Sequence, residues 1–179
     1  MKNLLKATLF AAEKHSQQRR KNSAQTPYIN HPIEVADHLS RVGGVANEAI
    51  LISALLHDTI EDTDTTAEEI ATEFGDDIAT LVMECTDDKS LEKQERKRLQ
   101  IVNAPHKSSA AKQIKIADIS CNLRSILVDP PAGWSQQRQL EYFQWAEKVV
   151  AGLLGENDAL DKEVSEVLAQ GLSKLSTYL

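Results

Sequence analysis

The chain has 179 residues, of which 41% are hydrophobic and 26% are charged, and it contains only 7 glycines and 5 prolines. This composition excludes a disordered or collagen-like chain and argues against an all-β protein built from many tight turns. The formal net charge of −7 argues against broad binding to the phosphate backbone of nucleic acids.

Apolar residues recur at intervals of three and four along almost the whole chain, which is the spacing of amphipathic helices. In the first half, this spacing predicts helices at 4–15, 32–43, 49–56, 66–75 and 78–82. The segment 49–56 is apolar almost all round, so we expect a central, buried helix there. Thr66 and Glu69 form a capping box for the next helix, and Gly75 suits its end.

The second half continues the helical pattern. A strongly charged segment at 91–102 predicts a surface helix, and the helix expected at 110–127 is broken by Pro130-Pro131. Two more helices are expected at 140–153 and at about 157–177, and no alternating run of strand length competes with them. The sequence therefore predicts an all-α fold, with residues 1–179 forming one helical domain of about eight to ten helices.

The compartment follows from the cysteines and the apolar runs. Cys85 and Cys121 are too few for a disulfide framework, so we expect buried free thiols in a cytoplasmic protein. No apolar run approaches the roughly 20 residues that span a bilayer. Charged residues interrupt the N-terminal apolar stretch, which is therefore read as a first helix and not as a signal peptide. We expect neither a membrane nor a nucleic acid as partner, and assembly into a homo-oligomer stays open.

Four residues of the ligand type lie at protected places in the predicted helices. His31 precedes Pro32 and so lies at the entrance of a helix. His57 and Asp58 end the buried apolar run, and Asp118 follows another apolar approach. A buried ionised carboxylate costs several kcal/mol unless its charge is compensated, and a divalent cation would compensate it. Two imidazoles and two carboxylates suit Mn²⁺ or Fe²⁺ and would also accept Zn²⁺.

Further polar residues follow these candidates at helical spacing. Glu61 and Asp62 come four residues after His57 and Asp58, so a continuing helix would place them one turn beyond, over the ion. Carboxylates there could orient or deprotonate a water molecule. In the same way Asn122, four residues after Asp118, would face the cavity with a hydrogen-bonding amide.

The pattern His31, His57-Asp58 and Asp118 resembles the HD-domain metal-dependent phosphohydrolases. Longer strings resemble the hydrolase domain of RelA/SpoT proteins: RRK at 19–21, PYINHP at 27–32, ALLHDTIEDT at 54–63, and AD with NLR within 117–124. Further strings resemble the stand-alone small alarmone hydrolases of the metazoan SpoT homologue type: TDDK at 86–89, ERKRLQ at 95–100 and GWS at 133–135. Together they cover about residues 5–155, with one departure at 119–121, where relatives commonly carry a lysine.

This resemblance implies a Mn²⁺-dependent 3′-pyrophosphohydrolase of (p)ppGpp, an alarmone of the stringent response, that releases pyrophosphate and GDP or GTP. It implies one Mn²⁺ per chain, with Fe²⁺ or Zn²⁺ as other occupants. Carried over by position, it also implies three groups of site residues: the metal ligands His31, His57, Asp58 and Asp118; the catalytic acids Glu61 and Asp62; and the substrate contacts Arg20, Lys21, Asn122, Lys97, Arg138 and Tyr142.

Two other functions stay open at this point. The same metal centre could hydrolyse another nucleotide, for example one phosphorylated at the 2′- or 3′-position. Alternatively, the chain could be a non-catalytic sensor that binds the alarmone, although a pure binder has no use for the pair Glu61 and Asp62. Residues 19–21 and 93–98 also have a plain interpretation, as a solvated charge run and a salt-bridged helix face.

Overall fold

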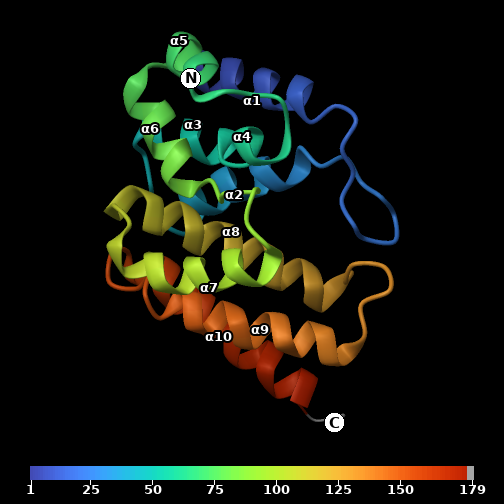
Figure 1. The fold of residues 1–179 in the computed structure, drawn as a ribbon. Helices are drawn as coiled ribbons and strands as arrows, with labels where there is room; N and C mark the ends of the chain where they lie inside the picture. The colour runs from blue at the N-terminus through green and yellow to red at the C-terminus, as the bar shows by residue number, and fades with distance from the viewer. Residues whose placement is uncertain (177–179) are drawn as a thin grey trace.

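The computed structural model describes residues 1–176, and it confirms the all-α class (Figure 1). Within these residues the only strand-like feature is an isolated bridge between Arg19 and Pro27. The predicted last residue of the C-terminal helix, 177, lies outside the described part of the chain. The elements are α1 (Lys2–Lys14), α2 (Asn30–Arg41), α3 (Glu48–Leu56), α4 (Thr59–Asp62), α5 (Ala67–Phe74), α6 (Asp76–Cys85), α7 (Lys93–Asn103), the 3₁₀ helix η1 (Ala104–His106), α8 (Ser109–Val128), α9 (Gln136–Val150) and α10 (Asp158–Ser176).

Several helices begin where the sequence offers a cap. In α3, α5, α8 and α9 a side-chain oxygen accepts a hydrogen bond from an amide of the first turn, and a cap of this kind contributes about 1 kcal/mol. The capping residues are Asn47, Thr66, Ser108 and Ser135. The predicted cap at Thr66 is thus confirmed. Gly75, with φ of 99°, ends α5 in a backbone conformation that other residues rarely adopt.

Helix α8 is the central element of the fold. It contacts α2, α3, α6, α9 and α10, and Figure 1 shows it running between α2 on one side and the pair α9 and α10 on the other. Ile114, Ile116 and Leu123 of α8 are fully buried, and burial of each such side chain stabilises the fold by about 1.5–3 kcal/mol. Any polar residue on the inner part of α8 is therefore enclosed by neighbouring helices.

The buried apolar side chains form two clusters. The larger one surrounds α8 and includes residues of α2, α9 and α10, whereas the smaller one lies between α1, α3, α5 and α6. Helix α3 contributes to both clusters, Leu51 to the first and Ile52 to the second. The prediction of a central buried helix at 49–56 is therefore confirmed. Cys85 and Cys121 are buried free thiols, as expected. None of the helices within residues 1–176 combines the length and apolar character needed to cross a membrane.

The helix that would continue from α3 to Asp62 is interrupted. Side chains at the break bind the last carbonyl groups of α3, which an uninterrupted helix would bond to amides. The ring Nδ1 of His57 donates to the carbonyl of Ala54 at 2.8 Å, and the hydroxyl of Thr59 donates to the carbonyl of Leu56 at 2.7 Å. The chain then resumes as the short helix α4, so residues 61 and 62 belong to a separate element.

Candidate active site

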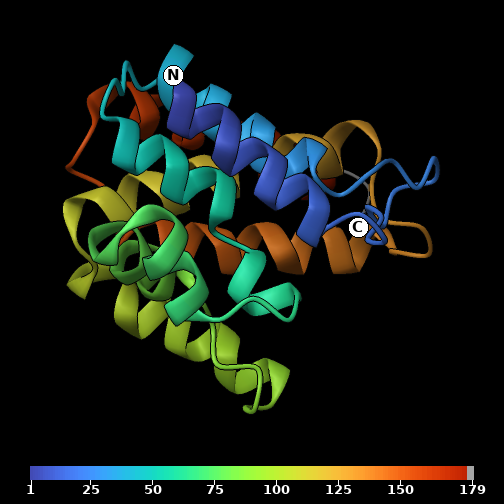
Figure 2. The same ribbon diagram turned by 90° about the horizontal axis from the view of Figure 1, so that it is seen from above.

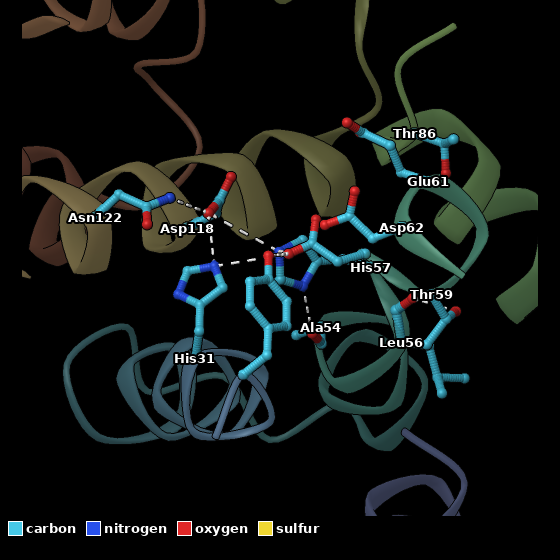
Figure 3. A network of polar contacts seen from close by, with 12 residues as sticks. His31, Ala54, Leu56, His57, Thr59, Glu61, Asp62, Thr86, Asp118 and Asn122 are labelled. Carbon is cyan, nitrogen blue, oxygen red and sulfur yellow. Dashed lines mark hydrogen bonds and ion pairs between the residues drawn. The ribbon is translucent and has the colours of Figure 1, made fainter. Parts of the chain in front are cut away.

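Four predicted residues meet where α2, α3, α4 and α8 come together. His31 is the second residue of α2, His57 and Asp58 lie between α3 and α4, and Asp118 lies within α8. His31 Nε2 is 3.0 Å from Asp118 Oδ1 and 3.8 Å from Asp58 Oδ2. His57 Nε2 is 3.2 Å from Asp58 Oδ2 and 3.9 Å from Asp118 Oδ1. Figure 3 shows His31, His57 and Asp118 pointing toward one another.

The ligand atoms of His31, His57 and Asp118 all lie within 4.8 Å of one another, a spacing that fits a divalent ion, and Asp58 Oδ2 lies beside the two imidazoles. Donors about 2.1 Å from one ion lie roughly 3–4 Å apart, depending on the angle between them, and the nitrogen–oxygen distances given above fall in that range. The set contains nitrogen and oxygen but no thiolate, which suits a borderline divalent metal. Both imidazoles are buried, with exposed fractions of 2% for His31 and 1% for His57, so the surrounding protein would shield an ion bound there from bulk water.

The environment of His57 shows a local need for positive charge. Its Nδ1 donates to the Ala54 carbonyl, which leaves Nε2 facing the carboxylates, and within the described residues this buried Nε2 has no hydrogen-bond partner. Burial alone would lower the pKa of His57, but Asp58 and Asp118 outweigh it and raise the pKa to about 9. A cation held between these groups would supply the missing charge.

Three further side chains hold the carboxylates in place. Tyr28 donates its hydroxyl to Asp58 Oδ2 at 2.5 Å. Asn122 Nδ2 donates to Asp118 Oδ1 at 2.7 Å, and Lys115 Nζ donates to Asp118 Oδ2 at 3.1 Å. Outer hydrogen bonds of this kind orient metal ligands and tune their basicity. The expectation that Asn122 faces the same cavity as Asp118 agrees with this contact.

Neither Tyr28 nor Lys115 is among the site residues predicted from the sequence. Tyr28 lies in the string PYINHP, three residues before His31, and Lys115 lies three residues before Asp118. The second spacing was a usable signal, because residues three apart on a helix are neighbours. Burial of Lys115 lowers its pKa, but Asp118 outweighs this effect and holds the pKa above its ordinary value. Lys115 is thus a fixed positive charge beside the cluster.

Glu61 and Asp62 are held close to the cluster by different partners. Asp62 lies one turn after Asp58, and its backbone amide donates a hydrogen bond to the Asp58 carbonyl at 2.9 Å. Its carboxylate accepts a hydrogen bond from Gln18 and pairs with Lys89. Figure 3 shows Asp62 beside His57 and Glu61 farther away, toward Thr86.

The carboxylate of Glu61 is half-enclosed by the segment that follows α6. It accepts a hydrogen bond from the backbone amide of Asp87 at 3.1 Å and lies 3.8 Å from a guanidinium nitrogen of Arg96. Burial raises the pKa of Glu61 above its ordinary value of 4.5. A carboxyl group of raised pKa beside a cation-binding cluster is suited to accept a proton from water.

A pocket of about 230 Å³ adjoins the cluster. Tyr28, Asp62 and Asn122 belong to its walls and are also in contact with the cluster or next to it. Four of the predicted substrate contacts line this pocket: Arg20, Lys21, Asn122 and Tyr142. With Arg19, three cationic side chains line the pocket next to the candidate metal ligands, together with the ring of Tyr142.

The other two predicted substrate contacts, Lys97 and Arg138, are not among the residues that line the pocket. Lys97 Nζ lies over the ring of Trp145 at 4.8 Å, and the Arg138 guanidinium lies over the ring of Trp134 at 4.6 Å. Both cations are therefore engaged with aromatic faces. Trp134 is itself part of the pocket wall, so Arg138 contacts a residue of that wall.

Residues 7–140 match the family model of the HD domain. Two curated relatives are named guanosine-3′,5′-bis(diphosphate) 3′-pyrophosphohydrolase MESH1. The one from Xenopus tropicalis is 54% identical over 95% of this chain and 96% of the relative, and the one from Homo sapiens is 52% identical over 93% of each. The chain belongs to the HD-domain family.

A solved HD-domain structure supports the same assignment at the level of the fold. It is described as "A metazoan ortholog of SpoT hydrolyzes ppGpp and plays a role in starvation responses". It matches this HD-domain chain with a TM-score of 0.92 and 50% identity, over 94% of this chain and 96% of that one. The resemblance to RelA/SpoT hydrolases is therefore confirmed over nearly the whole chain.

Proposed function

We propose that this HD-domain protein is a hydrolase that removes the 3′-diphosphate of guanosine-3′,5′-bis(diphosphate), ppGpp. The observation that carries the proposal is that His31, His57, Asp58 and Asp118 lie together beside a pocket lined by three cationic side chains. We infer the substrate from two relatives that are named guanosine-3′,5′-bis(diphosphate) 3′-pyrophosphohydrolase. This chain aligns with each of them over nearly its full length. The products are pyrophosphate and GDP, or GTP when the substrate is pppGpp.

The four converging side chains are assigned as the ligands of one divalent ion per chain. We propose Mn²⁺, with Fe²⁺ or Zn²⁺ as other occupants, because nitrogen and carboxylate donors accept all three. A divalent ion bound there supplies a Lewis acid that polarises a phosphoryl oxygen and lowers the pKa of water. Tyr28 and Asn122 keep Asp58 and Asp118 oriented for this purpose.

Glu61 and Asp62 of α4 are the candidate acceptors for the proton of the attacking water. Water attacks the phosphorus that is joined to the ribose 3′-oxygen, and the bond between that phosphorus and the 3′-oxygen breaks. Glu61 or Asp62 accepts the proton that the attacking water loses, and the departing 3′-oxygen takes up a proton. Glu61 suits the base role because its raised pKa lies closer to neutral pH than that of an exposed glutamate.

The pocket offers complementary chemistry for the rest of the nucleotide. Arg20 and Lys21 make no side-chain hydrogen bond or ion pair within residues 1–176, and both line the pocket. They are available for the substrate's phosphates, whose charge would otherwise be repelled by a protein of net charge −7. Tyr142 and Trp134 offer ring faces to the base. Lys97 and Arg138 would then act through the aromatic rings that they cover.

The decisive assay uses metal-free protein reloaded with Mn²⁺. Incubation with ppGpp should release pyrophosphate and GDP in equal amounts, and Asp118→Asn and Glu61→Gln should abolish nearly all of this release. Exposed Glu166, changed to Gln, serves as the matched control and should leave the rate unchanged. A metal-loaded protein that leaves ppGpp intact would contradict the proposal. A panel of nucleotides with 2′- or 3′-phosphates separates it from a different HD-domain activity, and calorimetry showing binding without turnover would indicate a sensor.

The proposal also covers the domain organisation of the chain and its cellular compartment. We propose that residues 1–179 act as one domain, which agrees with the contacts that α8 makes with helices from both halves of the chain. We also propose that the protein acts in the cytoplasm, where thiols such as Cys85 and Cys121 stay reduced. Its partner in the reaction is a small nucleotide.

A further inference from the structure

Two loops from distant parts of the chain form one rim of the pocket. The first, residues 18–27, joins α1 to α2 and carries Arg20 and Lys21. The second, residues 129–134, joins α8 to α9. Figures 1 and 2 both show these two loops side by side at the same end of the molecule. Both loops contribute residues to the pocket wall, including Asp129 from the second.

Asp129 joins the two loops through both of its carboxylate oxygens. Ser23 Oγ donates to Oδ1 at 3.0 Å, and Asn22 Nδ2 donates to Oδ2 at 2.9 Å. A backbone bond lies next to them, from the amide of Ala132 to the carbonyl of Lys21 at 2.8 Å. Hydrogen bonds to an ionised carboxylate are stronger than those between neutral groups.

Besides Asp129, the first loop is attached to the rest of the pocket by the backbone bond between Ala132 and Lys21 and, at its first residue, by the hydrogen bond from Gln18 to Asp62. None of residues 18–27 is buried, so no apolar core holds it. Its internal bonds, such as the Arg20 amide to the Thr26 carbonyl at 2.8 Å, shape the loop but do not attach it to the pocket. At its base, the Tyr28 amide donates to the Gln18 carbonyl. Segments with few buried contacts open at low cost unless specific bonds hold them.

We propose that Asp129 is a positioning residue for the substrate, and this proposal rests on the function proposed above. Its carboxylate holds residues 22 and 23 of the loop, so that the neighbouring cations of Arg20 and Lys21 stay at the pocket. The contacts of Asp129 do not include the candidate metal ligands. Its loss should therefore weaken substrate binding and leave the chemical step intact.

The direction in which KM changes when Asp129 is removed distinguishes the positioning role from a simple effect of its charge. Asp129 is itself a negative charge in the wall of a pocket proposed to bind a polyanion. If its charge alone mattered, its removal would lower KM, since unlike charges attract and like charges repel. If it positions the loop, its removal raises KM because the two cations are no longer held in place.

The kinetic test compares variants on ppGpp with Mn²⁺. Asp129→Ala should raise KM about tenfold with kcat within about twofold, the pattern of lost binding and intact chemistry. Ser23→Ala should raise KM less, and the double variant should resemble Asp129→Ala because the two residues share one interaction. Exposed Asp77, changed to Ala, loses the same charge elsewhere and should leave KM unchanged. An Asp129→Ala variant with unchanged or lowered KM would overturn the proposal.

A second readout does not depend on the reaction. Trypsin cleaves after arginine and lysine, and the loop presents Arg19, Arg20 and Lys21. Cleavage at these sites, followed by mass spectrometry, should be several times faster in Asp129→Ala than in wild type or in Asp77→Ala. Equal cleavage rates would contradict the proposal. A wild-type protein that does not hydrolyse ppGpp would contradict the proposed function, while the cleavage rates would still decide whether Asp129 holds the loop.

Discussion

His31 Nε2 and Asp118 Oδ1 lie 3.0 Å apart although 87 positions separate the two residues in the sequence. The packing of α2 against α8 creates this contact. Together with His57 it places two buried imidazoles and a carboxylate within 4.8 Å of one another, with Asp58 beside the imidazoles, an arrangement that a divalent ion would stabilise.

Metal binding should stabilise the folded protein. The ligands converge only in the folded state, so added Mn²⁺ shifts the unfolding equilibrium by about 2.7 kcal/mol when the free ion is at 100 times its Kd. Thermal unfolding of metal-free protein should therefore show a higher Tm with increasing Mn²⁺, and Asp118→Asn should abolish the increase. An equal response of wild type and Asp118→Asn would contradict the ligand assignment.

Tyr28 should control metal affinity although it is not a ligand. Its hydroxyl donates to Asp58 Oδ2, and loss of such an outer hydrogen bond weakens metal binding by about 10–100-fold. Calorimetric titration of metal-free Tyr28→Phe with Mn²⁺ measures the change. Tyr142→Phe is the matched control, because within residues 1–176 the ring of Tyr142 contacts Trp134, Trp145 and Lys97 and not a candidate ligand. Equal affinities in the two variants would show that the contact with Asp58 has no such effect.

Glu61 should govern turnover and its dependence on pH. Glu61→Gln should lower kcat by about 10²–10⁴-fold, the usual contribution of a general base, while Mn²⁺ affinity stays near the wild-type value. Burial raises the pKa of Glu61 above 4.5, so wild-type kcat should fall as the pH decreases through that raised pKa and the carboxylate takes up a proton. A pH–rate profile measures both effects. A Glu61→Gln variant with wild-type kcat would remove Glu61 from the mechanism.

Local patterns in the sequence predicted most of the fold. Helical periodicity, the cap at Thr66 and the break at Pro130-Pro131 all act over a few residues, and the structure has helices in the corresponding places. The interruption after α3 was not predicted, because it depends on the side chains of His57 and Thr59, which bond carbonyls that a continuous helix would use. Periodicity alone does not report this competition.

The site residues that belong to the family motif could be predicted from the resemblance. Residues whose role depends on contacts between distant segments were hard to predict. The motif identified the four residues that meet at the cluster. The hydrogen bond from Tyr28 to Asp58 depends on how the loop before α2 meets α4, and no spacing in the sequence encodes that contact. Likewise, no spacing in the sequence encodes the contacts of Lys97 with Trp145 and of Arg138 with Trp134, and a contact of either cation with the substrate stays a prediction.

Helix α10 should contribute stability that depends on pH. Glu163 of α10 accepts a bond from Arg124 at 3.0 Å and lies 3.2 Å from His38 Nε2. Burial raises the pKa of Glu163, but its contacts with His38 and Ser120 outweigh burial and lower it below the ordinary value of 4.5. Because the folded-state pKa is the lower one, the stabilisation is complete above pH 4.5 and is lost as the pH falls through the folded-state pKa.

Urea unfolding of Glu163→Gln measures this contribution. The variant should be less stable than wild type by about 2 kcal/mol at pH 7, and the difference should shrink as the pH is lowered below 4.5. Exposed Glu166 on the same helix, changed to Gln, should show neither effect. A constant difference between pH 7 and pH 3.5 would mean that ionised Glu163 is not the source of the stability.

The assignment of the four ligands is tested most directly by diffraction from crystals grown with Mn²⁺, recorded at a wavelength where manganese scatters anomalously. The predicted result is one strong anomalous peak per chain, about 2.2 Å from the Nε2 atoms of His31 and His57 and from carboxylate oxygens of Asp58 and Asp118. A map in which manganese is bound by other residues, or in which the protein fully loaded in solution shows no peak between these four side chains, would contradict it.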